Sequence, residues 1–475
     1  MPLRLSCFLF AAVACAWQGS DTGTKLLYVE PFTTKSGAEE LRNDVTAELR
    51  KLNSVSLVAD QSNADLILGG GGAIWVRGYR SFSPRSHMKL PTNGTPVYSG
   101  YLSVELKNKQ GVTLWSYLAT PGSGSGDVSK DLSKKIARNL AGALNQPESH
   151  KPASSEAQAA IALKGAGATF PFPVYSKWFT NYRTENPAVQ ITYDAIGSEG
   201  GIRKLLAGEV DFGGSDSPEA IHEIAPGDES KYLFFPSVVG AVVPIVNVPG
   251  VPDDIAFTPE ALAGIYLGKI KKWNDPILKR ANRGINLPDL DIVVVHRADG
   301  SGTSYAWTDY LSNTSPEWRA AVGASLTPKW PAGRAANGND GVAKLVKELG
   351  GSIGYVEFIY ALQNHIGYGK VRNQNGDYVD ASLESIATAV VHAMEIREDF
   401  KSSIVDPPGE GAYPISSFTW IVIPSHFADD SKRFAMTTFL RWMIGPGQRQ
   451  AAALGYLALP KDIVSREEAA IAKIH

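Results

Sequence analysis

Hydrophobic and polar residues in the second half of the chain repeat one order: a short apolar strand, a loop and an amphipathic helix. The β-branched run at 292–295 is typical of a buried strand, and the apolar positions of 305–311 recur at helical spacing. The same order predicts strands beginning near 163 and at 189–194, each followed by a helix, at 174–185 and 202–207. Alternation of strands and helices predicts an α/β fold.

Three of the predicted loops join the end of a strand to the start of a helix and are rich in glycine and hydroxyl residues. They lie at 165–171, 197–201 and 297–304. The first amides of a helix lack partners within the helix and carry partial positive charge, glycine lets an anion approach the backbone, and Arg297 adds a cation. One such loop is equally well explained as a tight turn with a serine cap. Three of them, with Asp216 after a further short strand, favour an anion-binding site.

The region from residue 20 to residue 145 has a different pattern. Short strands are predicted at 25–30, 55–58, 66–68, 73–76, 98–107 and 111–117, and amphipathic helices at 38–52 and 128–144. This order predicts a small α+β accessory domain. The glycine runs at 69–72 and 122–126 lack the Lys-Ser/Thr of a P-loop, and we interpret them as turns or flexible loops. Residues 146–160, rich in Pro, Ser, Ala and charge, are predicted to be a linker.

Length and charge narrow the class of protein. A chain of 475 residues is too long for one ordinary domain, and 44% hydrophobic residues with mixed charges are typical of a globular protein. The formal net charge of −2 argues against a nucleic-acid binder that depends on bulk electrostatic attraction. A small anion needs only a local field, so the charge leaves that hypothesis open.

The first residues predict export from the cytoplasm. One basic residue, a short apolar stretch and small residues precede Cys15, as in a secretory signal peptide over 1–19 that is too short to span a membrane. Residues 12–15 resemble a bacterial lipoprotein processing site, which predicts lipidation of Cys15; ordinary signal cleavage nearby is the alternative. Cys7 and Cys15 are the only cysteines, so the mature chain is predicted to contain neither a disulfide nor a thiolate metal site.

Patterns of catalytic residues give no support for an enzyme. Residues 350–354 match G-x-S-x-G, but a helix is predicted before this stretch and a strand after it, the reverse of a hydrolase nucleophile elbow. The eight histidines are scattered without metal-ligand spacing. We therefore expect no catalytic residue, no metal and no cofactor.

The motifs from residue 161 to the C-terminus closely resemble, in order, those of the phosphate-binding protein of the bacterial high-affinity phosphate ABC transporter, a periplasmic substrate-binding protein. The matching stretches are 165–171, 197–201, 211–216, 268–275, 297–304, 338–341 and 354–357. The resemblance implies a two-lobed periplasmic-binding-protein fold, type II-like, over 161–475. Lobe one would comprise 161–237 and 413–475, and lobe two would comprise 238–412. The chain would cross between the lobes at 234–240 and 413–419. The resemblance does not cover residues 1–150.

The resemblance also implies a phosphate buried between the lobes. The residues that would contact it are Thr169, Phe170, Ser198, Asp216, Arg297, Ser301, Gly302 and Thr303. Among them, Arg297 would make a bidentate guanidinium contact and would be oriented by Asp299 from behind. Asp216 would accept a proton from the ligand.

Elementary chemistry supports the role of Asp216 independently. Phosphate near neutral pH still carries a proton that a carboxylate can accept, whereas sulfate has none and would leave a buried acceptor unpaired. Sites that hydrogen-bond a ligand OH reject analogues lacking it by about 10⁴ to 10⁵.

One position departs from the family pattern: Glu199 stands where the best-known members have a small hydroxyl residue. It would weaken anion binding if it pointed inward, but it could also face solvent and favour the helix dipole.

These observations predict a periplasmic or cell-envelope receptor that binds inorganic phosphate and delivers it to the permease and ATPase of an ABC transporter. Its membrane contact would be the lipid anchor alone, and the accessory domain would engage an envelope protein. One alternative is a phosphate-responsive scaffold or sensor that acts through the accessory domain. A phosphatase is the other alternative, with less support, because no nucleophile or metal cluster accompanies the anion loops.

Overall fold

The computed structural model describes residues 25–34, 38–80, 95–109, 113–119, 127–145, 161–251, 255–393 and 396–474. The predicted signal peptide, Cys15 and the linker lie outside these residues. Within the described ranges, no helix is both long enough and apolar enough to cross a membrane.

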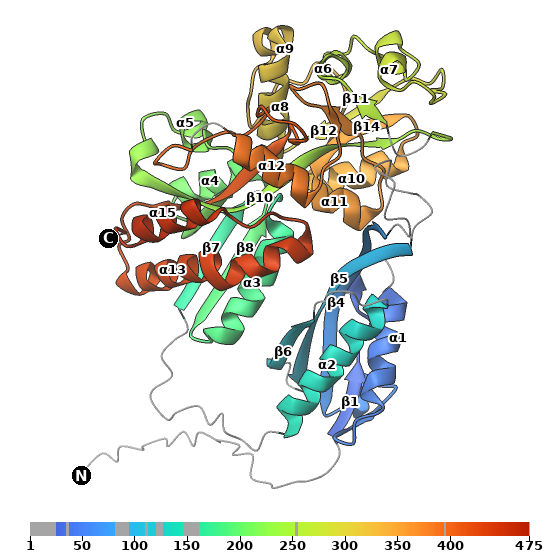
Figure 1. Ribbon diagram of the computed structural model, residues 1–475. Helices are drawn as coiled ribbons and strands as arrows, with labels where there is room; N and C mark the ends of the chain where they lie inside the picture. The colour runs from blue at the N-terminus through green and yellow to red at the C-terminus, as the bar shows by residue number, and fades with distance from the viewer. Residues whose placement is uncertain are drawn as a thin grey trace, which may run out of the picture.

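The N-terminal domain is a mixed β-sheet with two helices packed on it (Figure 1). Its strands are β1 (Lys25–Val29), β2 (Thr33–Thr34), β3 (Val55–Leu57), β4 (Leu66–Arg80), β5 (Thr95–Asn108) and β6 (Thr113–Ala119), in the order β3-β1-β4-β5-β6 with β2 beside β4. The helices are α1 (Ala38–Leu49), α2 (Val128–Asn145) and the short η1 (Gln61–Asn63). Alternate residues of β5, namely Leu102, Val104 and Leu106, are buried in the core of this domain.

The sequence pattern predicts a turn or flexible loop at the glycine run 69–72, and this prediction is wrong. The glycines lie in the middle of β4, which pairs with β5 from Leu66 opposite Asn108 to Arg80 opposite Thr95. The apolar segments on both sides belong to one strand, and ladder hydrogen bonds carry it through the glycines. Glycine at position 69 also leaves space for the side chain of Glu30, since a Cβ on residue 69 would lie 2.4 Å from Oε2 of Glu30. The second glycine run, 122–126, lies outside the described residues.

The rest of the chain is built on an eight-stranded sheet in the order β13-β12-β14-β10-β17-β9-β7-β8. These strands are β7 (Ile161–Gly167), β8 (Val189–Ala195), β9 (Phe212–Ser215), β10 (Tyr232–Asn247), β12 (Val293–Arg297), β13 (Arg334–Ala336), β14 (Ser352–Glu357) and β17 (Ser416–Pro424). A small separate sheet contains β11 (Ala256–Phe257), β15 (Lys370–Arg372) and β16 (Tyr378–Val379). The long strands β10 and β17 lie at the centre of the large sheet and are buried almost throughout.

Two groups of elements flank these central strands, and we call them lobe one, around β7, β8 and β9, and lobe two, around β12, β13 and β14 (Figure 1). The helices of lobe one are α3 (Phe172–Glu185), α4 (Ser198–Leu206), α5 (Ala220–Ile224), η2 (Glu229–Lys231), α13 (Asp430–Trp442), η3 (Met443–Gly447), α14 (Gln448–Ala451), η4 (Ala452–Leu454) and α15 (Lys461–Ile471). Those of lobe two are α6 (Pro259–Tyr266), α7 (Pro276–Ala281), α8 (Gly302–Thr314), α9 (Pro316–Ala321), α10 (Gly338–Glu348), α11 (Phe358–Asn364) and α12 (Leu383–His392).

The predicted α/β fold is confirmed. Three strand–loop–helix units occur where the sequence pattern indicated them: β7 leads into α3, β8 into α4 and β12 into α8. The two stretches expected to cross between lobes fall on or beside β10 and β17, where Val239 pairs with Phe418. The carboxyl ends of β7, β8 and β12 lead into loops that contact the opposite lobe.

Candidate functional site

The loops singled out in the sequence meet between the two lobes. The backbone amide of Gly302, the first residue of α8 in lobe two, donates a hydrogen bond of 3.0 Å to Oγ of Ser198, the first residue of α4 in lobe one. Asn339 of lobe two donates from Nδ2 to Oγ1 of Thr169 at 2.8 Å and to Oγ1 of Thr303 at 3.2 Å. The lobes are therefore closed on each other, and groups from both converge on one buried site.

Arg297 is the buried cation of this site. It is 3% exposed, its Nε donates to Oδ1 of Asp299 at 2.7 Å, and its Nη2 donates to Oδ2 of the same carboxylate. The guanidinium is thus held in one orientation by a two-point contact. Its remaining group, Nη1, is buried and has no hydrogen-bond partner among the described residues.

The carboxylate of Asp299 is matched to this role. Burial by itself would raise the pKa of Asp299, but the hydrogen bonds and charge of Arg297, together with the amide of Gly338, outweigh it and hold the pKa below its ordinary value. The Gly338 amide donates to Oδ1 at 2.9 Å. Asp299 is consequently ionised near neutral pH and fixes Arg297 from behind.

Asp216 supplies the opposite kind of group. Its side chain is 1% exposed, and Oδ1 accepts a 2.7 Å hydrogen bond from the hydroxyl of Thr419 on β17. Oδ2 is buried and has no partner in the described part of the chain. Burial raises the pKa of Asp216 to about 7, against the opposing effects of the Thr419 hydroxyl and the charge of Arg297. The site therefore holds a donor on Arg297 and an acceptor on Asp216 that no described residue satisfies.

Helix ends complete the surroundings of these two groups. Ser301 caps α8 by accepting from the amide of Ser304 at 3.1 Å, and α3 and α4 start at the ends of β7 and β8. The carbonyl of Phe170, whose ring is buried, accepts a 2.6 Å hydrogen bond from the hydroxyl of Tyr456. Free amides at helix starts favour a negatively charged ligand.

Two glycines allow the lobes to approach this closely. A Cβ on Gly302 would lie 2.5 Å from Oγ of Ser198 and 2.6 Å from the backbone nitrogen of Asp216. Gly197 has φ of +91°, which favours glycine, and a Cβ there would lie 2.5 Å from Oδ2 of Asp299. A side chain at either position would hold the lobes apart.

Glu199 does not present a free carboxylate to the site. Its Oε1 accepts from Nε and Nη2 of Arg203, one turn later on α4, at 2.8 and 2.6 Å. Its backbone amide donates to the carbonyl of Gly300 across the lobe boundary at 3.1 Å. The acid at this position is compensated within its own helix.

Four residues that the sequence did not single out also shape the site: Asn339, Tyr355, Glu357 and Thr419. Tyr355 donates to Oγ of Ser304 or accepts from it at 2.6 Å and accepts from the backbone amide of Arg297 at 3.2 Å. Glu357 is fully buried, and burial raises its pKa well above the ordinary value; its amide donates to Oδ1 of Asn339 at 3.0 Å. Three of the four lie in stretches that carried the family resemblance, which was the available signal. Thr419 had no local signal, since it comes close to Asp216 only through the pairing of β17 with β9.

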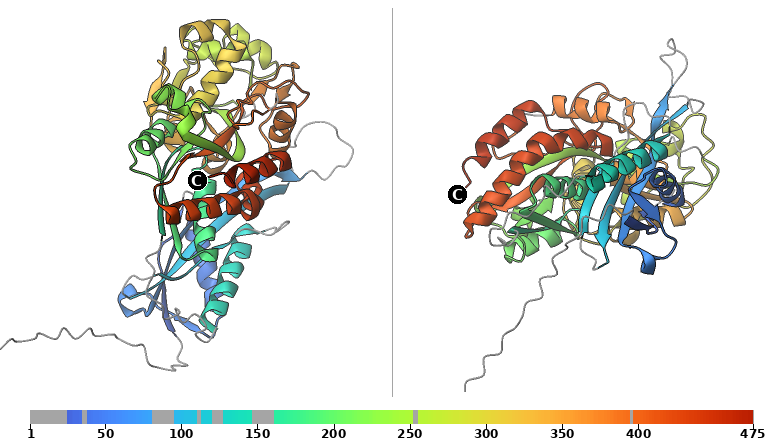
Figure 2. Two further views of the ribbon diagram at one scale, coloured as in Figure 1. Left: turned by 90° about the vertical axis from the view of Figure 1, so that its left-hand side faces the viewer. Right: turned by 90° about the horizontal axis from the view of Figure 1, so that it is seen from below.

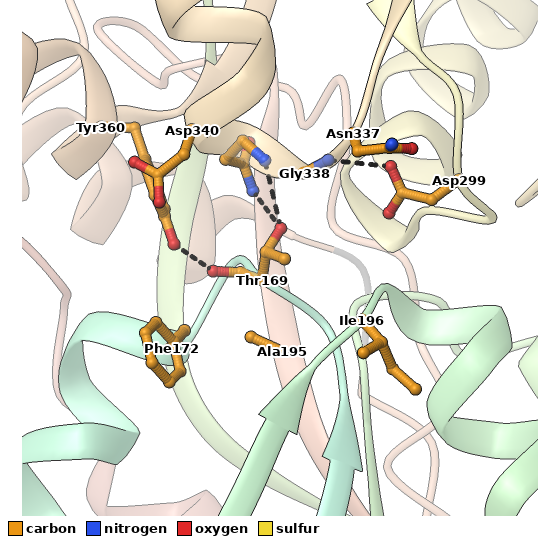
Figure 3. Close-up of a pocket in the computed structure, with 10 residues that line it drawn as sticks. Thr169, Phe172, Ala195, Ile196, Asp299, Asn337, Gly338, Asp340 and Tyr360 are labelled. Atoms are coloured by element: carbon orange, nitrogen blue, oxygen red, sulfur yellow. Dashed lines mark hydrogen bonds between the residues drawn. The ribbon is translucent and has the colours of Figure 1, made fainter.

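A pocket of about 490 Å³ borders the site (Figure 3). Phe172 and Ile196 line it from lobe one and Asn337 and Tyr360 from lobe two, and it reaches Thr169 and Asp299 of the site. Figure 3 shows the hydrogen bonds that join Thr169 to the opposite lobe, including the 2.6 Å bond from the Tyr360 hydroxyl to the Thr169 carbonyl. Asp216 and Ser198 do not line this pocket. No group of three or more His, Cys, Asp or Glu side chains in the described ranges could hold a metal ion.

The chain matches a known family over most of its length. The family model described as a PBP superfamily domain matches residues 152–446. The phosphate-binding protein PstS of Xylella fastidiosa (strain Temecula1) is 40% identical over 330 residues, which is 69% of this chain and 90% of that protein. The phosphate-binding protein PstS of Pasteurella multocida is 38% identical over 312 residues, 65% of this chain and 90% of that protein.

Solved structures share the fold. A high-affinity periplasmic phosphate-binding protein (PfluDING), solved with bound phosphate, is similar with a TM-score of 0.53 and 21% identity, over 65% of this chain and 93% of its own. A phosphate-binding protein from Stenotrophomonas maltophilia gives a TM-score of 0.52 and 19% identity over the same shares. The family model and the curated relatives establish that the chain belongs to the PBP superfamily and, within it, to the family of phosphate-binding proteins.

Proposed function

We propose that this protein binds inorganic phosphate outside the cytoplasmic membrane and delivers it to an ABC transporter for import. One observation carries the proposal: the closed site contains a buried donor, Nη1 of Arg297, and a buried acceptor, Oδ2 of Asp216, neither of which has a partner among the described residues. Buried polar groups in folded proteins are nearly always hydrogen-bonded, so such a pair calls for a ligand. A singly protonated phosphate offers both a charged oxygen for the arginine and an OH for the carboxylate.

The proposal assigns the other predicted residues to the same ligand. In this proposal Arg297 binds phosphate oxygens, Asp216 accepts the phosphate proton, and Asp299 orients Arg297. Further hydrogen bonds would come from the residues predicted for this role: Thr169, Phe170, Ser198, Ser301, Gly302 and Thr303. Sulfate brings no proton, so it would place a bare oxygen against the Asp216 carboxylate and be rejected.

The protein is a binding protein and not an enzyme, in keeping with its family. We further propose that the protein is a periplasmic receptor, lipidated at Cys15, that docks on a permease–ATPase complex. The proposed site sits between lobes that are joined by two crossing strands, a geometry suited to hinge closure around a ligand. Release to a permease would then require the lobes to open.

Binding and delivery can be tested with one pair of full-length variants. Arg297→Lys keeps a positive charge but loses the fork geometry, whereas Arg280→Lys makes the same change on the exposed face of α7. Retention of radiolabelled phosphate by purified protein should fall at least about 10-fold for the first variant and stay unchanged for the second. Phosphate uptake by cells that carry each variant as their only copy should follow the same order. Equal binding by both variants would refute the assignment of Arg297.

A further inference from the structure

The N-terminal domain contacts both lobes of the receptor. Strand β4 lies against α11 of lobe two, whereas β6 lies against α3 and β5 against η4, both in lobe one. Figures 1 and 2 show the small domain beside the two-lobed part, with the β4–β5 end of its sheet reaching toward α11. A domain that touched only one lobe could follow that lobe freely during opening. This one cannot, because its contacts are divided between the two.

The contact with lobe two is made by a projecting part of the sheet. In the described part of the chain, β1 pairs with β4 only as far as Leu68 and β2 only as far as Gly72. Beyond that point β4 has β5 as its sole strand neighbour, up to Arg80 opposite Thr95. A two-stranded ribbon is marginally stable alone and needs a surface to pack on. Helix α11 provides such a surface.

The helices that meet the N-terminal domain bury polar side chains. On α11 the side chain of Gln363 is 8% exposed, and most of this seven-residue helix is buried around it. On α3 the side chain of Lys177 is also 8% exposed, and burial lowers its pKa to about 8. Lysine is rarely buried unless it is paired, yet burial is the sole cause of the lowered pKa of Lys177, and no charged partner among the described residues offsets it. We attribute the burial of both side chains to the N-terminal domain, because β6 lies against α3 and β4 lies against α11.

The same two helices border the opening between the lobes. Phe172 at the start of α3 and Tyr360 in α11 line the pocket of Figure 3 from opposite sides. Any rotation that widens this opening moves α3 and α11 relative to each other. Strand β4 contacts α11 and β6 contacts α3, so the N-terminal domain would then lose at least one of these two contacts.

We infer that the N-terminal domain is an intramolecular brace that docks across α3 and α11 and stabilises the closed arrangement of the lobes. The inference rests on the proposed phosphate function. Because phosphate and the docked domain would stabilise the same arrangement, each must strengthen the other by the same factor. The brace would therefore slow the release of phosphate.

The test uses a matched pair of charge reversals on α3 in the full-length protein. Lys177→Glu places an anion at the buried position, whereas Arg183→Glu makes the same change of charge at an exposed position of the same helix. Hydrogen exchange of β6 and α3, with and without saturating phosphate, reports docking, and calorimetric titration with phosphate reports affinity. Gln363→Glu repeats the test from α11, and circular dichroism verifies that each variant is folded.

In the unmodified protein, phosphate should slow hydrogen exchange in β6. Lys177→Glu and Gln363→Glu should speed it and weaken phosphate binding by about 5-fold or more, while Arg183→Glu should change neither. The inference is overturned if exchange in β6 ignores phosphate, if the buried variants leave docking intact, or if docking is lost without a change in phosphate affinity. Absence of phosphate binding by the unmodified protein would instead refute the proposed function, so the two failures are distinguishable.

Discussion

The hydroxyl of Thr419 donates a 2.7 Å hydrogen bond to Oδ1 of Asp216, and so assigns one carboxylate oxygen to the protein and leaves the other for a ligand. Thr419 lies on the central strand β17, which pairs with β9 just before Asp216. The hydrogen bond favours the ionised carboxylate and partly offsets the effect of burial on the pKa of Asp216. The threonine therefore orients the proposed selector and limits the rise of its pKa.

Replacing Thr419 by valine should raise the pKa of Asp216 further, because a donor to the carboxylate is lost. Hydrogen bonds to charged groups contribute about 1.5–3 kcal/mol, equivalent to roughly 1–2 pH units. In titrations with sulfate between pH 6 and pH 9, the variant should therefore still bind sulfate at a pH at which the unmodified protein no longer does. Thr438→Val removes a hydroxyl that donates to Phe434 within α13 and should leave the profile unchanged. Identical profiles for both variants would exclude a role for Thr419.

The unmodified site should itself accept sulfate better in acid. With a pKa of about 7, Asp216 of the unliganded site becomes a carboxylic acid as the pH falls, and its OH can then donate to a sulfate oxygen. Calorimetric titration at pH 8.5 and pH 5.5 should show sulfate affinity rising by roughly 10-fold or more toward acid. Sulfate binding that is equally weak at both pH values would show that another group controls the selection.

Enlarging Gly302 should prevent closure. A Cβ at this position would overlap Ser198 and the backbone of Asp216, so Gly302→Ala must push the lobes apart. Overpacking of this kind costs about 1–3 kcal/mol, which predicts phosphate binding roughly 5-fold to 150-fold weaker, measured by equilibrium dialysis. Gly142→Ala on α2, where a Cβ would meet nothing within 4 Å, is the control. Unaltered affinity in Gly302→Ala would mean that the lobes bind phosphate without closing this far.

The buried carboxyl group of Glu357 should make stability depend on pH. Its pKa is raised well above 4.5 in the folded protein, so above about pH 4.5 the unfolded chain loses a proton that the folded protein keeps, and stability falls as the pH rises toward the folded pKa. Glu357→Gln removes this loss of stability, which amounts to up to about 1.4 kcal/mol per pH unit. The glutamine can still cap α11. In urea unfolding, the variant should gain stability over the unmodified protein from pH 5 to pH 8. The control Glu384→Gln, at an exposed position, should not gain stability. A gain of Glu357→Gln that does not depend on pH would contradict the protonated state of Glu357.

Much of this site could be predicted because its elements are local in sequence. A glycine-rich loop between a strand and a helix specifies its own geometry, so Arg297, Ser301 and Thr303 were identified together, as were Thr169 and Ser198. Asn339 and Thr419 could not be found this way. Each reaches the site through tertiary structure: Asn339 bridges Thr169 and Thr303 across the lobe boundary, and Thr419 depends on strand pairing.

The fold shows the same limit. Hydrophobic periodicity and turn residues predict the three strand–loop–helix units, but they also predict a turn or flexible loop at 69–72, because glycine weakens strands locally. Pairing with β5 along the whole of β4 overrides that tendency. The contacts of the N-terminal domain with α3 and α11 left no trace in the sequence pattern, since they join segments that are far apart along the chain.

The central claim is that Asp216 selects phosphate by accepting its proton. Calorimetric titration of the full-length protein, stripped of ligand, with phosphate and then sulfate at pH 8, alongside Asp216→Asn, tests it most directly. We expect tight phosphate binding and no detectable sulfate binding by the unmodified protein, and at least about a 10-fold loss of discrimination in the variant, because asparagine can donate to sulfate. Equal binding of both anions by the unmodified protein, or full discrimination retained by Asp216→Asn, would contradict the account.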